Sequence, residues 1–304
     1  MKKTIVIRVD GGICAQIAFV SMGMNLAAKF GESVAVKYDL SWYRDWGKDL
    51  NGQQVRNWDF PKAFPSVPCK EASREEIRRL SRWHKSRGRN VENFRPPLYI
   101  GGYPDRYPGM CRLASVLRGH FRPRLDEVSV RWLGEIARGH VCAVHVRRGD
   151  LAAFNPAYGN PATAEYFSKA IGIVRSIDPE AGFLFFSDDP VWVRNELFAS
   201  LPGNVRKEVV EGHDSSAGYQ DLYLISKCMH VISSSGSLGV FGAVLADDCR
   251  TLVMNRNREY AFKYLKNVIY LNDSYHEEGL LGSPAGGGWL RRLWRTLRNG
   301  RCGA

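Results

Sequence analysis

The pattern of apolar and polar residues in the first forty positions predicts a βαβ unit. Residues 4–9 (TIVIRV) have the length and composition of a buried strand, and they lead into a glycine turn at residues 10–12. An apolar helix is expected at about 15–30, and a second strand at 34–38. Strand, glycine turn, helix and strand in this order are typical of an α/β domain with a parallel sheet.

The second half of the chain predicts another unit of the same kind. Residues 141–147 (VCAVHVR) are almost all apolar, as expected of a strand that a parallel sheet buries on both faces. Thr163 is placed to cap the helix that follows, with Glu165 in its first turn. Further strands are expected at 182–186, 206–210, 231–233 and 251–254, and helices at 164–177, 191–198, 221–229 and 237–246.

These elements predict an α/β fold with two Rossmann-like units and a cleft between them, one unit at 1–138 and the other at 139–272. A chain of 304 residues is long enough to bury two cores. Residues 41–108 are rich in Trp, Arg, Pro and Gly and weakly periodic, so surface loops and short helices are predicted there. Residues 273–304 are expected to form a glycine-rich hinge and a basic C-terminal helix.

The cysteines and the N-terminus favour a cytoplasmic protein. Seven cysteines occur without a CxxC pair, and Cys142 and Cys228 lie in apolar segments, which indicates buried thiols and no zinc site. The stretch MKKTIVIRVDGG is interrupted by Arg8 and Asp10, so it predicts a first strand and not a signal peptide. No continuous apolar run approaches the roughly 18 residues of a membrane-spanning helix.

The formal net charge of +12 indicates either an anionic partner or basic residues that serve only as solvated surface. Nucleic acid, an anionic membrane surface and a phosphorylated substrate are the partners that such a charge suits. Basic residues gather at 74–95, where a solvated helix face is an equally good explanation, and after residue 289, where it is a poorer one. No base-stacking module is evident, so nucleic acid is not expected as a partner.

The sharpest polar segment follows the predicted strand at 141–147, the position at which open α/β sheets bind ligands. It is His145-Val146-Arg147-Arg148-Gly149-Asp150. A guanidinium there could grip a diphosphate through two hydrogen bonds and stabilise its charge without a metal. Taken alone, solvated arginines and a buried histidine at a strand end explain the segment slightly better.

Three further segments are weaker on their own. Ser187-Asp188-Asp189 could bind a divalent metal, accept from ribose or guanine, or cap the next helix, and capping is the simplest explanation. Residues 233–237 (SSSGS) open a helix and could bind a phosphate, although an ordinary serine-rich cap explains them as well. Asp10-Gly11-Gly12 with Gln16 would let backbone approach a ligand, but many tight turns look alike.

In this order the segments resemble the bacterial α-1,2-fucosyltransferases of glycosyltransferase family 11. The family's HxRRGD motif matches 145–150 and its FSDD motif matches 186–189, both completely. Its GGLGNQ-type loop, its YxxAI helix and its DLxLMSxCKHxIIxNSSFSWWGAWL segment match 11–16, 166–171 and 221–245 loosely. Because HxRRGD is shared with α-1,6-fucosyltransferases, the superfamily is better supported than the linkage.

The resemblance implies a GT-B fold, with the acceptor on the N-terminal side and the nucleotide held mainly by the C-terminal domain. It implies an inverting transfer of L-fucose from GDP-L-fucose to the galactose 2-OH of a bacterial surface glycan, with no metal cofactor. Arg147 is the implied diphosphate ligand and Asp150 the implied general base, with His145 in the same catalytic group. The implied contacts to the GDP-sugar come from Gly11, Gly12, Gln16, His145, Arg147, Arg148, Asp188, Asp189, Ser234, Ser235 and Ser237.

Departures from the family pattern leave alternatives open. Cys14-Ala15 stands where the family has Gly-Asn, and Gly236, Gly239, Val240 and Phe241 interrupt the NSSFSWW pattern. A pocket changed in this way suits another GDP-sugar or another linkage. The altered first loop also suits a sugar-binding protein without catalysis, although the intact HxRRGD and FSDD motifs argue against it. A basic nucleic-acid-binding protein is the remaining alternative.

The C-terminal segment 289–301 predicts an amphipathic helix after a glycine-rich hinge at 282–288. Its large apolar residues share one helical face and its arginines the other: Trp289, Leu290, Leu293, Trp294 and Leu297 against Arg291, Arg292, Arg295 and Arg298. This pattern predicts peripheral contact with anionic lipid on the inner face of the cytoplasmic membrane, and hence a lipid-linked acceptor. A terminal helix packed on the protein's own body is the alternative.

We predict that the full chain floats with vesicles containing anionic lipid at low salt, whereas a chain ending at Gly282 does not. Each arginine near an anionic surface should contribute about 1 kcal/mol of attraction. The measurement is flotation of the two proteins side by side. Equal flotation of both, or of neither, would show that the tail is not a membrane anchor.

Overall fold

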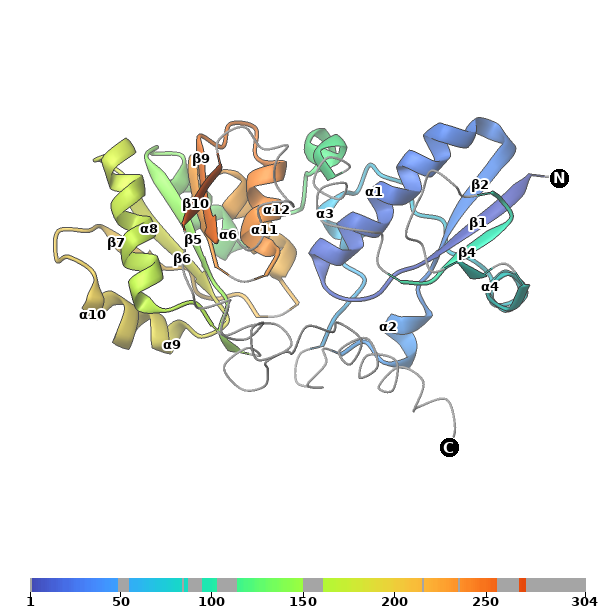
Figure 1. Cartoon of the computed structure of the whole chain (residues 1–304), viewed down its shortest axis with the longest axis horizontal. Helices are drawn as coiled ribbons and strands as arrows, with labels where there is room; N and C mark the ends of the chain where they lie inside the picture. Colours follow the sequence, from blue (N-terminus) through green and yellow to red (C-terminus); the bar gives the residue numbers. More distant parts are fainter. Residues whose placement is uncertain are drawn as a thin grey trace, which may run out of the picture.

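Two parallel β-sheets lie side by side in the protein, with helices packed around and between them (Figure 1). The computed structural model describes residues 2–48, 55–83, 85–86, 95–102, 114–149, 161–214, 216–234, 236–255 and 268–271. The first sheet has the strand order β2-β1-β4-β3, and the second has the order β10-β9-β8-β5-β6-β7. All pairings between these strands are parallel, as the alternation of strands and helices predicts.

The first sheet is built on the predicted βαβ opening. β1 (Lys3–Arg8) and β2 (Val34–Asp39) pair with Ile5 opposite Val36, and α1 (Ile13–Phe30) connects them. The two predicted strands are confirmed, and the helix begins slightly earlier than expected because Gly12 is its N-cap.

α1 is the central apolar helix of this half of the molecule. By length and composition, residues Ile13–Ser33 could cross a membrane, although no continuous apolar run in the sequence suggested it. In the structure 67% of the apolar window is buried inside the protein. α1 packs on the first sheet and on α3 (Phe60–Ala63), and this packing accounts for its apolar character.

The segment 41–108 contains more regular structure than its weak periodicity predicts. α2 (Ser41–Asp45), α3 and α4 (Arg74–Trp83) are short helices of the kind expected. However, β4 (Leu98–Ile100) is a buried strand that pairs with β1, and β3 (Lys85–Ser86) pairs with β4. The expectation of loops and short helices alone was wrong here, because strands of two or three residues are too short to show a period.

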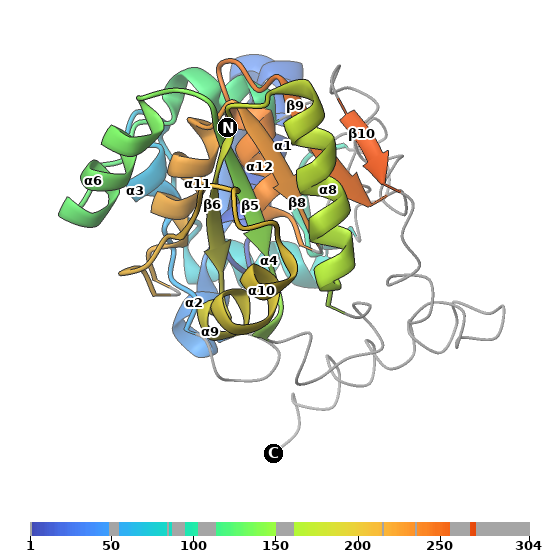
Figure 2. The same cartoon turned by 90° about the vertical axis from the view of Figure 1, so that its left-hand side faces the viewer.

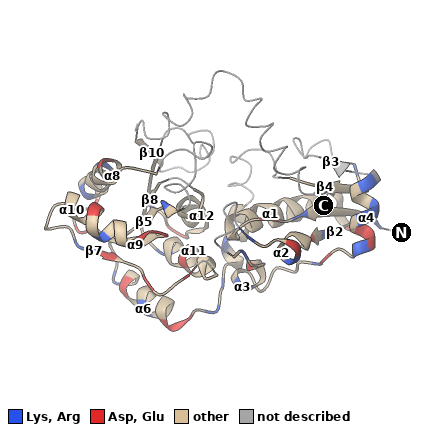
Figure 3. Ribbon diagram, turned by 90° about the horizontal axis from the view of Figure 1, so that it is seen from below, with Lys and Arg blue, Asp and Glu red and all other residues tan. Residues whose placement is uncertain are grey.

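Four arginines of the first basic cluster lie on α4, at the outer end of the first sheet (Figure 3). The same helix carries Glu75 and Glu76 in its first turn, and Glu76 forms an ion pair with Lys37 of β2. This mixture of charges favours the solvated-face explanation for Arg74, Arg78, Arg79 and Arg82.

The second sheet is doubly wound around its central strand. Its strands are β5 (Val141–Val146), β6 (Gly182–Ser187), β7 (Lys207–Val209), β8 (His230–Ser233), β9 (Thr251–Asn255) and β10 (Val268–Leu271). From β5 the chain adds β6 and β7 on one side, and it then crosses to add β8, β9 and β10 on the other. The order therefore reverses between β5 and β8, which is the topological switch point at which such sheets bind ligands.

Helices cover both faces of the second sheet (Figure 2). Cys142 and Val144 of β5 pack with α8 (Ala164–Ile177) on one face. Val141 and Ala143 pack with α11 (Gly218–Ser226) and α12 (Leu238–Leu245) on the other. Burial on both faces confirms the interpretation of this apolar run as a central parallel strand.

Most other elements of this half lie where the pattern predicts them. Thr163 caps α8 by accepting a hydrogen bond from the Tyr166 N–H at 3.2 Å, as expected. The helix predicted at 191–198 is divided into α9 (Pro190–Trp192), a π-helical turn η4 (Val193–Leu197) and α10 (Phe198–Ser200). β10 was not predicted.

The two sheets share one hydrophobic core across the segment that connects them. This segment contains η3 (Ser115–His120) and α6 (Glu127–Ile136), and α6 packs on α11 although it lies within the limits predicted for the first unit. Aromatic rings meet across the junction. Phe60–Phe64 and Phe64–Phe121 are stacked, at centroid distances of 4.7 and 4.9 Å, and Phe121–Tyr223 is an edge-on pair at 5.1 Å. Such pairs contribute about 0.5–1.5 kcal/mol beyond their buried area.

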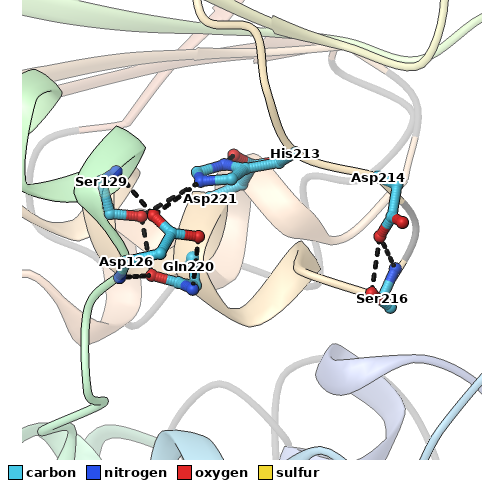
Figure 4. A network of polar contacts seen from close by, with 7 residues as sticks. All are labelled: Asp126, Ser129, His213, Asp214, Ser216, Gln220 and Asp221. Atoms are coloured by element: carbon cyan, nitrogen blue, oxygen red, sulfur yellow. Dashed lines mark hydrogen bonds and ion pairs between the residues drawn. The ribbon is translucent and has the colours of Figure 1, made fainter.

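A polar network fixes α6 to α11 (Figure 4). His213 is almost fully buried, with Nδ1 2.6 Å from Asp221 Oδ1 and Nε2 3.1 Å from Ser129 Oγ. Asp126 accepts hydrogen bonds from the Ser129 N–H at 2.7 Å and from Gln220 Nε2 at 2.8 Å. The hydrogen bond to Asp221 raises the pKa of His213 above its ordinary value, against the opposing effect of burial.

The raised pKa of His213 predicts a pH-dependent stability. A histidine whose pKa is higher in the folded state contributes stability that is full below its unfolded pKa of about 6.5 and is lost as pH rises through the folded pKa. We therefore expect the difference in unfolding free energy between the wild type and His213→Gln to shrink as pH rises from about 6 to 9. Urea unfolding at each pH measures this difference.

Val130→Ala is the matched control, because Val130 is an exposed, uncharged residue on the same helix, α6. This variant removes no titratable group, so its effect on the unfolding free energy should not depend on pH. A His213→Gln effect that is constant over the same pH range would contradict a protonated His213.

Candidate functional site

The loops after β5 and β8 meet at the switch point of the second sheet. The Arg147 N–H donates to Ser234 Oγ at 3.0 Å, and the Ser234 N–H donates to the His145 carbonyl oxygen at 3.1 Å. These two hydrogen bonds hold the residues after β5 and β8 at a fixed spacing. Two of the segments singled out in the sequence are thus brought together.

Two glycines let α12 and its preceding loop approach the end of β5 closely. Gly236 has a φ of 95°, and a Cβ there would lie 3.0 Å from Arg147 Cδ and 3.5 Å from His145 Cε1. A Cβ at Gly239 would lie 2.9 Å from both His145 Cβ and Ser233 Oγ. The departures from the family pattern at these positions therefore have a packing reason, since larger residues would displace α12. His145 is buried beneath them.

The carboxylates after β6 hold the segment that follows Arg147. Asp188 Oδ1 accepts the Arg148 N–H at 2.8 Å, and Asp188 Oδ2 lies 3.2 Å from where a Cβ of Gly149 would be. Asp189 Oδ1 accepts the Trp192 N–H at 3.1 Å, which confirms helix capping at this position.

The Arg148 side chain is held by the same strand end. Its Nε lies 3.5 Å from Asp189 Oδ2, and its guanidinium carbon lies 3.8 Å from the centroid of the Trp192 ring. These two contacts hold the Arg148 side chain against the protein, so it is not simply a solvated arginine. Among the residues that the structure describes, no group of three or more His, Cys, Asp or Glu side chains could hold a metal ion.

The first glycine loop is shaped by Gln16. Its Nε2 donates to the carbonyl oxygens of Gly11 at 3.2 Å and Asn57 at 2.7 Å, and its Oε1 accepts from the N–H groups of Asp59 at 2.9 Å and Phe60 at 2.8 Å. The side chain is fully buried. Gln16 was expected to contact the GDP-sugar; instead its amide is occupied by backbone groups, and it positions the loop. Gly11 has a φ of 81°, which favours glycine.

The first turn of α1 lies against the switch point of the second sheet. Burial raises the pKa of the Cys14 thiol to about 12, while a hydrogen bond from Ser237 and the charges of Arg147 and Arg56 act in the opposite direction. Cys14 is therefore close to groups from both halves of the molecule. The predicted residues Gly12, Arg147 and Ser237 all lie around this junction.

Arg56 is a site residue that the sequence did not reveal. Its guanidinium Nη1 lies 3.8 Å from where a Cβ of Gly12 would be, so it borders the glycine loop from the side of the first sheet. A single arginine in an irregular segment gives no motif or periodic signal. Asp150 and Ser235 lie outside the described residues, as does the segment 289–301.

A family model described as Glycosyl transferase family 11 matches residues 84–276, which is more than half of the chain. The O-antigen biosynthesis glycosyltransferase WbnK of Escherichia coli is 30% identical over 106 residues, which cover 34% of this chain and 33% of that protein. Galactoside 2-alpha-L-fucosyltransferase SEC1 of Bos taurus is 28% identical over 116 residues, which cover 37% and 30%. The matched region thus spans about a third of the length of these relatives.

Solved structures share the arrangement of the two sheets. Fucosyltransferase NodZ from Bradyrhizobium has a TM-score of 0.54 at 12% identity, over 84% of this chain and 96% of that chain. A glycosyl transferase family 9 structure from Veillonella parvula DSM 2008 has a TM-score of 0.50 at 10% identity, over 95% and 93%. The predicted α/β fold of GT-B type, with two Rossmann-like domains, is confirmed.

Gly239→Ala is expected to destabilise the protein, because a Cβ would lie 2.9 Å from His145 Cβ and the backbone of α12 would have to shift. Overpacking of this kind costs about 1–3 kcal/mol of unfolding free energy. Gly172→Ala on α8 is the matched control, since nothing lies within 4 Å of its added Cβ. The control should gain up to about 1 kcal/mol from helix propensity. Urea unfolding that finds Gly239→Ala as stable as the wild type would contradict this close packing.

Proposed function

Because the chain belongs to glycosyl transferase family 11, we propose that it transfers L-fucose from GDP-L-fucose to a sugar hydroxyl with inversion at C1. The observation that carries the proposal is Arg147, which follows the central strand at the switch point of the second sheet. Open α/β sheets bind ligands there, and a guanidinium suits a diphosphate. The activities named for the Escherichia coli and Bos taurus relatives support the galactose 2-OH of a surface glycan as the acceptor.

The diphosphate of the donor is proposed to lie between Arg147 and the start of α12. The first N–H groups of a helix lack partners within it, and the helix dipole favours an anion at this end. Ser237 immediately precedes this helix, while Ser234 holds the backbone of Arg147. A carboxylate accepts several hydrogen bonds, so Asp188 can accept one from ribose or guanine in addition to that of Arg148.

In the proposed reaction Arg147 offsets the negative charge that develops on GDP as the C1–O bond breaks through an oxocarbenium-like transition state. The acceptor hydroxyl attacks C1 from the opposite face and gives its proton to a base. Asp150, which lies outside the described residues, is the proposed base. His145 is packed beneath Gly236 and Gly239 and therefore positions the Arg147 segment. No metal is proposed, since Arg147 and the helix end supply the positive charge.

Another GDP-sugar or another linkage is the second candidate function. It is favoured by Gly236 and Gly239, which depart from the family motif and let α12 pack closely on His145 and Arg147. We also propose that residues 289–301, outside the described residues, bind the inner face of the cytoplasmic membrane. A lipid-linked glycan under assembly would be the acceptor there.

Arg147→Ala is expected to abolish transfer from GDP-fucose while leaving the fold intact. Losing a charge-assisted contact to the leaving diphosphate should cost about 3 kcal/mol in the barrier, a hundredfold or more in rate. Arg147→Lys should also fail, because an ammonium cannot reproduce the two-point contact of a guanidinium. GDP release from GDP-fucose, with and without a β-galactoside, measures the effect.

Arg138→Ala is the matched control, because Arg138 is exposed and pairs with Glu135 at the end of α6. It should keep wild-type turnover. The same assay with UDP-sugars, and in EDTA with manganese added back, tests the donor and the absence of a metal. Near-wild-type turnover of Arg147→Ala, equal use of UDP-sugars, or activity that depends on manganese would each overturn the corresponding part of the proposal.

A further inference from the structure

A chain of aromatic rings runs from the core of the first sheet to the surface beside the glycine loop. Phe60 is fully buried, and the Trp58 ring stacks on it at 5.7 Å between centroids. Tyr43 follows at 6.0 Å from Trp58, and Trp42 at 4.9 Å from Tyr43. Tyr43 and Trp58 pack against the core while remaining partly exposed. Trp42 is edge-on to Tyr43, and Tyr43 is tilted against Trp58, so these rings form a platform in which they are held at fixed angles to one another and each can offer its own face.

The platform is attached directly to the loop that faces the switch point. Tyr43 Oη donates to the Gly11 carbonyl oxygen at 3.0 Å, which fixes α2 against the loop. Gln16 binds the backbone on both sides of Trp58, through the Asn57 carbonyl oxygen and the Asp59 N–H. The rings therefore keep a fixed position relative to Gly11, and the platform continues the wall of the site already described.

The exposed end of the platform combines aromatic and charged side chains. Trp46 follows Trp42 by one helical turn, donates its N–H to the Trp42 carbonyl oxygen at 2.9 Å and is 45% exposed. Arg44 forms an exposed ion pair with Glu71, and Arg56 lies beside Gly12 at the inner end. Charged side chains therefore border the aromatic rings at this surface, whereas a lipid chain or an apolar peptide requires a continuous apolar patch.

We propose that Trp42, Trp46 and Trp58 form an acceptor subsite that stacks on a pyranose ring of the glycan, with Arg56 donating to its hydroxyl groups. A pyranose presents an apolar face of C–H bonds and a rim of hydroxyls, which suits flat rings bordered by charged donors. The attacking hydroxyl must come from the side opposite the leaving diphosphate at Arg147. The first glycine loop and Arg56 form that facing wall. The inference rests on the proposed function and adds the acceptor site to it.

Trp42→Ala and Trp46→Ala test this subsite with GDP-fucose and lactose as probes. Each variant should raise the KM for lactose about tenfold, the loss expected for one stacking contact. The affinity for GDP, measured by thermal shift, should not change. Trp42→Phe should recover part of the loss, because a flat ring is kept. Ile177→Ala is the control, since Ile177 is 50% exposed at the far end of α8.

The outcomes separate the subsite from the reaction. If the wild type transfers fucose and both tryptophan variants keep its KM for lactose, the subsite is wrong and the proposed function stands. If GDP affinity falls in parallel with acceptor use, the rings serve the donor or the fold, and the subsite is also wrong. If the wild type does not transfer to lactose, quenching of tryptophan fluorescence by methyl β-galactoside decides, and its absence overturns the subsite. If the protein binds detergent micelles and does not bind galactosides, the subsite is likewise wrong.

Discussion

Close packing of α12 on the carboxyl end of β5 is the constraint on which the site depends. Glycine at 239 brings the helix into contact with His145 and Ser233, and glycine at 236 adopts the positive φ with which the chain turns over Arg147. A side chain at either position would move α12 away from the switch point. With α12 in place, Ser234 reaches the Arg147 N–H, and the helix start and the guanidinium border the same space.

The sequence reveals an element when burial leaves a pattern long enough to recognise. β5 is buried on both faces, so five of its six residues are apolar, and the helix after Thr163 has both a cap and a period. β4 and β10 have three and four residues, and they are strands because neighbouring strands supply their hydrogen bonds. Apolar runs this short show no period of their own, which is why these strands were missed.

The sequence motifs identified many of the site residues but did not predict the role of each side chain. Gln16 was recognised within a glycine loop, yet its amide binds backbone groups more than forty positions away. Asp189 caps a helix and borders Arg148 at once, so a capping role and a role in the site do not exclude each other. Arg56 follows no motif and becomes visible only when the first loop folds beside it.

The junction between the two halves also explains why a neutral thiol at position 14 suits the site. Cys14 lies near Arg147 from one half and Arg56 from the other, and its pKa of about 12 keeps it uncharged at neutral pH. A carboxylate there would offset the charge of both guanidiniums before any ligand bound. The aromatic contacts from Phe60 to Tyr223 limit how far those halves can separate, which keeps the first glycine loop near the switch point of the second sheet.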